Sequence, residues 1–286
     1  MILEGRTLAQ QIREPLTQRA AAVCQKIGRP IRLAAVGSRE DYGAYVYLQK
    51  EVAAAQKIGI ETTVHDVDNK TSPARFQQMI RNFSEDSSVD CILIARPLPA
   101  QLAACDFASF ISPYKDVDGM SNISMGNLFL CKTWDEICAL KGFVPCTAMA
   151  VIKLLEFHHI NLSGKEVVVI GRSATVGRPL AHLLTCKNAT VKLCHRHTDL
   201  PRAVEGADII CSAAGSPGLL QTDWLKPGST VIDISTNWHQ GHLTGDADPV
   251  SLQARGINFS PVPGGVGPVT LAVLLENMIL SKERTL

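Results

Sequence analysis

The chain has 286 residues and a formal net charge of +1, with 46% hydrophobic and 19% charged residues. This length suits two modest domains or one large one, and the composition is ordinary for a globular protein. The near-zero charge excludes a basic field for nucleic acid, and no apolar run reaches the ~20 residues of a membrane span. We therefore expect neither a nucleic acid nor a membrane as partner.

Short apolar runs rich in β-branched residues alternate with segments of helical periodicity. In chain order, this pattern predicts helices at 7–27, 43–58, 72–84, 147–159, 176–187 and 268–283, and strands at 31–36, 61–66, 90–94, 166–170, 190–194, 208–212 and 230–234. Such alternation is typical of βαβ units with parallel sheets. Nearly continuous apolar strands such as "VVVI" indicate a sheet that is covered on both faces.

The strands fall into two groups, which predicts an α/β fold of two domains. Residues 112–147 lie between the groups and are rich in Gly, Pro, Asn and Ser, so we interpret them as the interdomain crossing. We expect an N-terminal α/β domain over 1–145, a Rossmann-like domain with a parallel sheet over 146–267, and a cleft between them.

The nine cysteines, from Cys24 to Cys211, contain no C-x-x-C pair. An odd, unpatterned count favours reduced thiols over a disulfide framework or a zinc site. The sequence therefore predicts a cytoplasmic protein.

A glycine-containing turn, "EVVVIGRSATVGRPLAHLL", joins the strand at 166–170 to the next helix. Gly171 allows a tight turn at the strand end, and Gly177 allows close approach at the start of the helix. The free N–H groups of that helix can bind an anion, as they bind the pyrophosphate in a Rossmann fold. The glycines are six apart, unlike G-x-G-x-x-G, and an ordinary β–α turn is the alternative.

The following strand ends in His195-Arg196-His197, without the carboxylate that binds the ribose hydroxyls in NAD sites. Arg172 and Arg196 can together hold a 2′-phosphate, which favours NADP over NAD. His195 and His197 could instead form a metal pair. No carboxylate or cysteine stands at ligand spacing, so no metal is expected.

Two more loops follow strands of this second group. Ala214 lies in "SAAGSPG" and Ile234 in "DISTN". The carboxyl ends of parallel strands are where ligands bind in open sheets. Simple turns are the alternative for both loops.

Several motifs resemble those of one known family. "PYKDVDG", "GRSATVGRP", "NATVKLCHRHT", "GDAD" and "PVPGGVGPVTLAVLLEN" are similar, in order and spacing, to the methylenetetrahydrofolate dehydrogenase/methenyltetrahydrofolate cyclohydrolase family. The similarity begins at "ILEGRTLAQQIR" and runs nearly end to end. It implies a homodimer whose N-terminal domain is completed by the C-terminal helix, 268–286. It also implies NADP as cofactor and one-carbon derivatives of tetrahydrofolate as substrates: methylenetetrahydrofolate is oxidised to the methenyl form, which is hydrolysed to 10-formyltetrahydrofolate.

The resemblance also implies roles for individual residues. Asp118 matches a carboxylate that binds the pterin ring and acts in catalysis. Gly264, Gly265 and Pro268 match the loop that closes over the folate. The matched cofactor contacts are Thr147, Gly171, Arg172, Ser173, Val176, His195, Arg196, Ala214, Ile234, Gly267 and Thr270.

Some positions depart from the family pattern. Ala95 stands where a glutamine commonly supports the catalytic lysine, and Arg96 replaces a leucine. Arg96 faces either solvent or a substrate carboxylate. In the other domain, Ala150 and Ser235-Thr236 stand where glycine and Gly-Ile are common, and Arg196 replaces a serine.

The largest departure concerns the catalytic pair Y-x-x-x-K. Tyr45 is followed at i+4 by Gln49, and Tyr47 by Glu51, while Lys50 is i+5 from Tyr45 and i+3 from Tyr47. Alignment from the preceding strand selects Tyr45, whereas alignment backwards from "KIGI" selects Tyr47. Lys50 either faces the cleft, with Tyr47 in a regular helix or with Tyr45 through a π-bulge, or is a solvated surface lysine.

These departures predict that the dehydrogenase survives better than the cyclohydrolase. Hydride transfer depends mainly on positioning, whereas hydrolysis needs a tuned acid–base group. Two alternatives remain: a paralogue acting on another small substrate, and a non-catalytic NADP-binding subunit.

Overall fold

The computed structural model describes residues 1–239 and 242–286. The chain divides into two compact units. The first comprises 1–11, 128–139 and 145–273, and the second comprises 12–127, 140–144 and 274–286. We refer to the first as the nucleotide unit and to the second as the helix–sheet unit.

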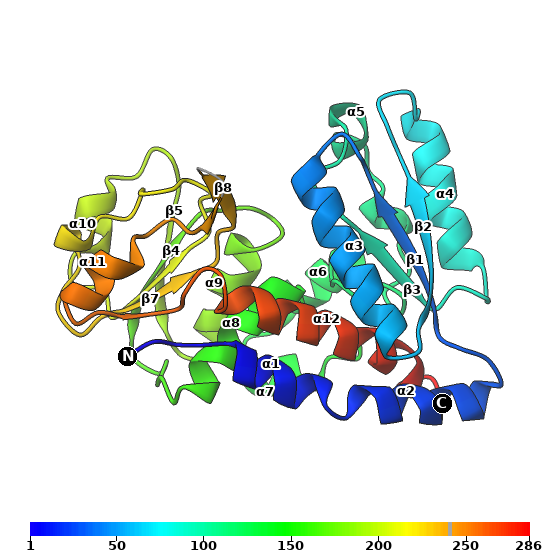
Figure 1. Cartoon of the computed structure of the whole chain (residues 1–286), viewed down its shortest axis with the longest axis horizontal. Helices are drawn as coiled ribbons and strands as arrows, with labels where there is room; N and C mark the ends of the chain where they lie inside the picture. The colour runs from blue at the N-terminus through cyan, green and yellow to red at the C-terminus, as the bar shows by residue number, and fades with distance from the viewer. Residues whose placement is uncertain (240–241) are drawn as a thin grey trace. The chain divides into compact units, whose positions relative to one another are not determined.

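The helix–sheet unit contains a three-stranded parallel sheet in the order β2-β1-β3 (Figure 1). The strands are β1 (Arg32–Gly37), β2 (Glu61–Asp66) and β3 (Cys91–Ile94), and their register pairs Leu33 with both Thr62 and Cys91. The predicted strands are confirmed here to within one residue at each end.

Helices cover both faces of this sheet. Side chains alternate along β1, so its neighbouring residues pack against helices on opposite faces. Leu48 of α3 (Tyr42–Lys57) packs against Gly37, leaving no room there for a Cβ atom. Val36, which points to the other face, packs with Phe76 and Ile80 of α4 (Pro73–Glu85).

The C-terminal part of α12 (Val266–Glu283) belongs to the helix–sheet unit. Lys282 forms a 2.7 Å ion pair with Asp90, which is fully buried and is also bound by Arg29. The side chain of Asn277 donates a 2.8 Å hydrogen bond to the carbonyl of Val117. The last helix of the chain therefore helps to hold β3 and the loop that carries Asp118.

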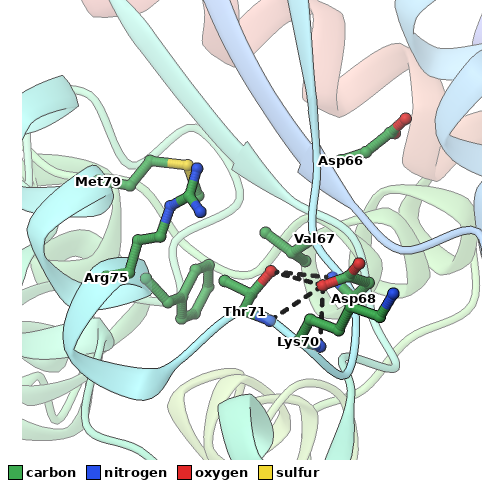
Figure 2. A pocket seen from close by; sticks show the side chains of 8 residues that line it. Asp66, Val67, Asp68, Lys70, Thr71, Arg75 and Met79 are labelled. Atoms are coloured by element: carbon green, nitrogen blue, oxygen red, sulfur yellow. Dashed lines mark hydrogen bonds between the residues drawn. The ribbon is translucent and has the colours of Figure 1, made fainter.

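A pocket of about 370 Å³ lies at the end of β2 (Figure 2). Asp68 accepts hydrogen bonds of 2.9 Å from the amides of Lys70 and Thr71, which fixes the loop beneath it. Arg75 and Met79 of α4 form another part of its wall. The residues lining this pocket include none of the predicted site residues, so we do not regard it as the active site.

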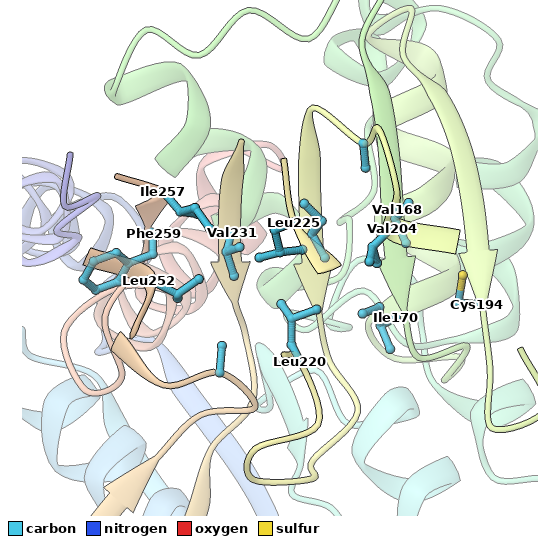
Figure 3. Close-up of a cluster of buried hydrophobic side chains, with 13 residues drawn as sticks. Val168, Ile170, Cys194, Val204, Leu220, Leu225, Val231, Leu252, Ile257 and Phe259 are labelled. Atoms are coloured by element: carbon cyan, nitrogen blue, oxygen red, sulfur yellow. The ribbon is translucent and has the colours of Figure 1, made fainter. Parts of the chain in front are cut away.

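The nucleotide unit contains a five-stranded parallel sheet in the order β10-β7-β6-β4-β5. Its strands are β4 (Glu166–Ile170), β5 (Thr190–Cys194), β6 (Ile209–Ser212), β7 (Thr230–Asp233) and β10 (Asn258–Phe259). A buried apolar cluster fills this unit, with Val168 and Ile170 from β4 meeting Ile210, Val231 and Phe259 (Figure 3). The predicted Rossmann-like sheet is thereby confirmed, with β10 as an addition.

Helices α8 (Cys146–Phe157) and α9 (Gly177–Cys186) also belong to this unit. The N-terminal segment joins the sheet edge, because the amide of Leu3 donates a 2.8 Å hydrogen bond to the carbonyl of Phe259. The remaining elements of the described chain are α1 (Arg6–Arg13), α2 (Leu16–Ile27), α5 (Ala100–Ala103), η1 (Ala108–Phe110), α6 (Asn122–Leu130), α7 (Trp134–Ala139), α10 (Leu200–Val204), η2 (Thr222–Trp224), β8 (Asn237–His239), β9 (His242–Thr244) and α11 (Pro249–Ala254).

Two expectations need correction. The single helix expected at 7–27 is two helices, which separate at Pro15. Proline lacks the amide hydrogen, and its ring clashes with the carbonyl four residues earlier. The crossing expected over 112–147 contains α6 and α7, because isolated Gly, Asn and Ser residues do not prevent a short helix that packing supports. Among the described residues, no helix is long and apolar enough to cross a membrane.

Candidate active site

The glycine turn after β4 is closely packed against backbone. Gly171 has φ +110°, and a Cβ atom there would lie 2.5 Å from the carbonyl oxygen of Ala213. A Cβ atom on Gly177 would lie 1.8 Å from the carbonyl oxygen of Gly171. Both glycines are therefore required, and they bring the start of α9 directly over the end of β4.

Ser173 organises the start of α9. Its hydroxyl oxygen accepts hydrogen bonds from the amides of Val176 (3.1 Å) and Gly177 (3.4 Å). Ser173 and Arg172 are exposed, so both can reach a ligand from this turn. Amides that converge at the start of a helix favour an anion, and the ordered turn after β4 is the place where a pyrophosphate binds in this type of sheet.

The turn after β5 lies beside the glycine turn. The amide of Gly171 donates a 3.1 Å hydrogen bond to the carbonyl of Cys194, the last residue of β5. His195 is held within its own turn, since its amide donates to the hydroxyl of Thr198 at 3.0 Å and its Nδ1 accepts from the amide of His197 at 3.2 Å. Arg196 is exposed and its Nε donates to the ring of His197.

His195 and His197 are the pair that the sequence offered as possible metal ligands. The two rings lie 6.0 Å apart, centroid to centroid. Within residues 1–239 and 242–286, no group of three or more His, Cys, Asp or Glu side chains has the geometry of a metal site.

A buried carboxylate joins the loops that follow β6 and β7. Asp246 is fully buried, and its Oδ2 accepts hydrogen bonds from the hydroxyls of Ser212 and Ser235, each at 2.6 Å. The amides of Ala214 (2.9 Å) and Ser216 (2.7 Å) also donate to this carboxylate. Asp246 therefore fixes the "SAAGSPG" loop, which carries Ala214, to the loop after β7.

A second carboxyl group lies behind this network. Asp233, the last residue of β7, is 3% exposed and accepts a 2.9 Å hydrogen bond from the amide of Ala247. Burial raises the pKa of Asp233 to about 7, and the nearby charge of Asp246 adds to the rise. The same packing requires a glycine at position 245, because a Cβ atom on Gly245 would lie 2.0 Å from the Asp233 carboxylate.

The loop before α12 belongs to the nucleotide unit. Gly264 has φ +115°, and its carbonyl accepts a 2.8 Å hydrogen bond from the amide of Gly5. Gly265 is buried and packs against Ser260 and Pro261, whereas Gly267 is exposed and has open space at its Cβ position. The hydroxyl of Thr270 donates a 3.2 Å hydrogen bond to the carbonyl of Val266. Pro268, within α12, is partly exposed.

Thr147 lies in the first turn of α8, and it is also partly exposed.

Helix α3 in the helix–sheet unit carries the tyrosines and the lysine. It is a regular α-helix, capped by Asp41, whose carboxylate accepts a 2.8 Å hydrogen bond from the amide of Ala44. Lys50 is exposed. Tyr45 lies under the guanidinium of Arg39, at 5.2 Å from the ring centroid. No π-bulge rotates Lys50 into the interior of this unit.

Glu51, rather than Lys50, lies on the buried face of α3 with Leu48, Val52 and Ala55. Its side chain is only 7% exposed. Burial raises the pKa of Glu51 well above its usual value, and the negative charge of Asp118 raises it further. The charge of Asp118 thus acts on the Glu51 carboxyl within the helix–sheet unit.

The loop carrying Asp118 is fixed by its neighbour. Asp116 is 2% exposed and accepts hydrogen bonds from the amides of Met120 (2.9 Å) and Ser121 (2.7 Å). The guanidinium of Arg96 lies 5.1 Å from the ring centroid of Phe107. Burial of this group lowers its pKa, and the negative charges of Asp118 and Asp116 act in the opposite direction. Asp118 therefore interacts electrostatically with two groups of this unit, the Glu51 carboxyl and the Arg96 guanidinium.

A five-stranded parallel sheet defines a Rossmann-type nucleotide-binding protein when a strand–glycine turn–helix unit follows an inner strand, here β4 between β6 and β5, and a basic turn follows the neighbouring strand β5. Residues 145–286 match the tetrahydrofolate dehydrogenase/cyclohydrolase NAD(P)-binding domain, and residues 3–118 match the catalytic domain of the same family. The chain belongs to the tetrahydrofolate dehydrogenase/cyclohydrolase family. The predicted family, fold class and nicotinamide cofactor are confirmed.

Relatives match over essentially their full length. The bifunctional protein FolD of Elusimicrobium minutum is 48% identical over 288 residues, covering 100% of both chains, and that of Nocardia farcinica is 39% identical, covering 99% of this chain and 97% of its own. The crystal structure of FolD from Campylobacter jejuni superposes with a TM-score of 0.91 at 34% identity, covering 100% of this chain and 99% of that one. The Trypanosoma brucei enzyme, solved with NADP and an inhibitor, gives 0.87 at 31%, covering 100% and 98%.

Two residues of these clusters had no predicted role. Glu51 is the residue at i+4 from Tyr47. The alignment backwards from "KIGI" places it at the position of the lysine in the family pattern Y-x-x-x-K, which is the signal that could have identified it. Asp246 lies in the "GDAD" motif, but nothing in the local sequence indicates that its partners come from two other loops.

Proposed function

We propose that the chain catalyses the NADP-dependent oxidation of 5,10-methylenetetrahydrofolate to the methenyl form and the hydrolysis of that product to 10-formyltetrahydrofolate. The observation that carries the proposal is the glycine turn of Gly171 and Gly177, beside a basic turn without a carboxylate, in a chain of this family. NADP, when bound, accepts the hydride that leaves the one-carbon bridge.

The residues of the nucleotide unit hold and orient the cofactor. The amides at the start of α9 and the exposed Ser173 suit the pyrophosphate, and Arg172 and Arg196 suit the 2′-phosphate. His195, Ala214 and Ile234, which lie in the turns after β5, β6 and β7, are further proposed cofactor contacts. Thr147, Val176, Gly267 and Thr270 are the remaining proposed contacts. Because the two nitrogens that flank the bridge carbon stabilise the cation, positioning is the main task of these residues.

For the folate, we propose Asp118 as the carboxylate that pairs with ring N–H donors of the pterin. Its loop is held by the buried Asp116, which limits the freedom of the Asp118 side chain. Gly264, Gly265 and Pro268 are proposed folate contacts from the loop before α12. Tyr45 and Tyr47 are the proposed aromatic contacts from α3.

We further propose a cytoplasmic homodimer. The edge strand β5 exposes Leu193, and α6 exposes Phe129. Both residues line an apolar hollow of about 380 Å³ in the nucleotide unit, together with Val191 and Ala181. A hydrophobic sheet edge of this kind favours pairing with a second copy. The unpatterned cysteines support a reducing compartment.

The direct test mixes the purified protein with NADP and methylenetetrahydrofolate and follows NADPH, then supplies methenyltetrahydrofolate alone and follows its loss. We expect both reactions to exceed their buffer blanks. Failure of NADPH to form would refute the proposed oxidation. A rise in melting temperature with NADP but not with folates would favour a paralogue with another substrate.

A further inference from the structure

Helix α3 presents an acid where the family pattern Y-x-x-x-K has a lysine. Glu51 follows Tyr47 by four residues, roughly 40° further around the helix, which is the spacing of that pattern. Its side chain is 7% exposed, whereas Lys50, roughly 100° away on the same helix, points to solvent. The structure therefore agrees with the alignment that selects Tyr47, because the residue at the lysine position in that alignment, Glu51, lies on the buried face of α3.

The surroundings of Glu51 disfavour the charged form of its carboxyl group. Two effects raise its pKa: burial, which is the larger, and the charge of Asp118. Strands β1 and β2, against which α3 packs, bring no charged side chain that shifts this pKa among residues 12–127 and 140–144. No cation of the described unit lowers it, and Arg96 acts on Asp118 rather than on Glu51.

We propose that Glu51, and not Lys50, is the acid–base group of the hydrolytic step, in place of the family's lysine, with Arg96 as the cation that balances Asp118. The inference rests on the folate chemistry proposed above. The end of β1 joins the elements involved: the Cβ position of Gly37 lies within 4 Å of both Leu48 of α3 and Ala95, and the bridge between Ile92 and Asp116 holds the Asp118 loop to β3. If Asp118 holds the pterin ring, Glu51 on α3 is therefore placed near the bound substrate. Ala95 fits this replacement, because the glutamine that supports a lysine is not needed by a carboxyl group.

The reaction balances with one carboxyl group. Water forms a bond to the methenyl carbon and transfers a proton to the carboxylate form of Glu51, which leaves a neutral carbinolamine. The carboxylic acid form then gives that proton to N5 as the bond between N5 and the carbon breaks. The hydroxyl proton leaves to solvent as the formyl C=O forms, and Glu51 returns to its carboxylate form.

A carboxyl with a raised pKa suits both halves of this step. A group that acts in turn as base and acid works best when its pKa lies near the operating pH, which an exposed glutamate does not meet. The buried position of Glu51 thus gives its carboxyl group a raised pKa, which suits it to the acid–base role that a lysine has in the family pattern.

The test compares three variants in the two assays, methenyltetrahydrofolate loss and NADPH formation. Glu51→Gln keeps the shape of the carboxylic acid and should lower the hydrolysis rate about 100-fold or more, since acid–base catalysis contributes about 10²–10⁴-fold. Its NADPH formation should stay within about 5-fold of wild type. Gln49→Ala, on the exposed face of α3, is the matched control, and Lys50→Ala tests the competing residue.

Several results would overturn the inference. They are unchanged hydrolysis in Glu51→Gln, loss of hydrolysis in Lys50→Ala, or equal losses of both reactions in Glu51→Gln. A wild-type protein that forms NADPH but does not hydrolyse the methenyl form would also overturn it, while leaving the proposed oxidation intact. A protein that forms no NADPH fails the proposed function instead.

A measurement without turnover completes the test. Infrared difference spectra of the wild type, recorded across a pH titration, should show the carbonyl band of a protonated carboxylic acid that persists well above pH 5. Asp233, whose pKa is raised to about 7, contributes a carbonyl band of its own, so the Glu51 band is the part that is present in the wild type and missing in Glu51→Gln. The hydrolysis rate of the wild type should follow the titration of that part. Identical spectra of the wild type and Glu51→Gln would refute the assignment.

Discussion

The hydroxyl of Ser235 donates a 2.6 Å hydrogen bond to Oδ2 of the fully buried Asp246. The same hydroxyl oxygen accepts the amide of Gly215 at 3.0 Å. The side chain of Ser235 therefore ties the loop after β6 to the loop after β7. Both loops lie at the proposed cofactor edge of the sheet.

Removal of this hydroxyl should destabilise the nucleotide unit. Ser235→Ala leaves a buried carboxylate with one donor fewer and an amide without its acceptor. Hydrogen bonds to charged groups contribute about 1.5–3 kcal/mol, so the free energy of unfolding should fall by about that amount. Urea denaturation measures it, with Thr236→Ala as the control, because that neighbour is exposed and should change stability by less than about 0.5 kcal/mol. Equal effects of the two variants would contradict the prediction.

Asp233 should make stability depend on pH. Its folded-state pKa of about 7 exceeds the unfolded value near 3.8, so the folded state holds a proton that the unfolded state has lost. Stability should therefore fall as pH rises from about 4 to about 7, by about 3 kcal/mol between pH 5 and pH 8, at about 1.4 kcal/mol per pKa unit.

The matched variants for this dependence are Asp233→Asn, whose amide does not ionise, and Asp199→Asn, which removes an exposed carboxylate. Denaturation at pH 5 and pH 8 should show a smaller difference in Asp233→Asn than in the wild type. The difference should be unchanged in Asp199→Asn. If Asp233→Asn keeps the full wild-type difference, another group is responsible.

The regular parts of the fold follow from local sequence. Apolar, β-branched runs such as "VVVI" predict their strands to within a residue or so, because a covered parallel strand needs little besides that pattern. The short strand β10 escapes prediction, since its two residues pair with β7 only through contacts distant in the sequence. The break at Pro15 was predictable from the residue itself.

The parts of the site that depend on backbone conformation were predictable from the sequence. The parts that depend on side-chain partners from other loops and helices were less predictable. Gly171 and Gly177 are marked by their spacing after a strand, and the structure gives the reason as backbone contacts below 3 Å. The burial of Glu51 depends on how α3 packs against the sheet. The spacing between the tyrosines and Lys50 therefore leaves two alignments, with Tyr45 or with Tyr47, and does not decide between them. The role of Asp246 requires three loops to converge, which no local pattern shows.

Gly177 should not tolerate a methyl group. Gly177→Ala places a Cβ atom 1.8 Å from the carbonyl oxygen of Gly171, so either the turn or the start of α9 must shift. Overpacking of this kind costs about 1–3 kcal/mol or more. We expect a lower melting temperature and a loss of its rise with added NADP. Gly126→Ala is the control, because its Cβ position is open and it lies inside α6, where alanine is favoured. A Gly177→Ala protein that keeps wild-type NADP affinity would refute the assigned role of the turn.

Arg196 should discriminate NADP from NAD. Its exposed guanidinium follows β5, where an NAD site has a carboxylate, and a charge-assisted bond to the 2′-phosphate contributes about 1.5–3 kcal/mol. Arg196→Ala should therefore raise the KM for NADP about 10–100-fold and leave the KM for NAD nearly unchanged. Lys192→Ala, which removes an exposed cation from the same strand, should change neither constant by more than about 3-fold if long-range steering is weak. Parallel losses for both cofactors in Arg196→Ala would mean that Arg196 supports the turn rather than the phosphate. Equal effects of Arg196→Ala and Lys192→Ala would mean that net charge alone is being measured.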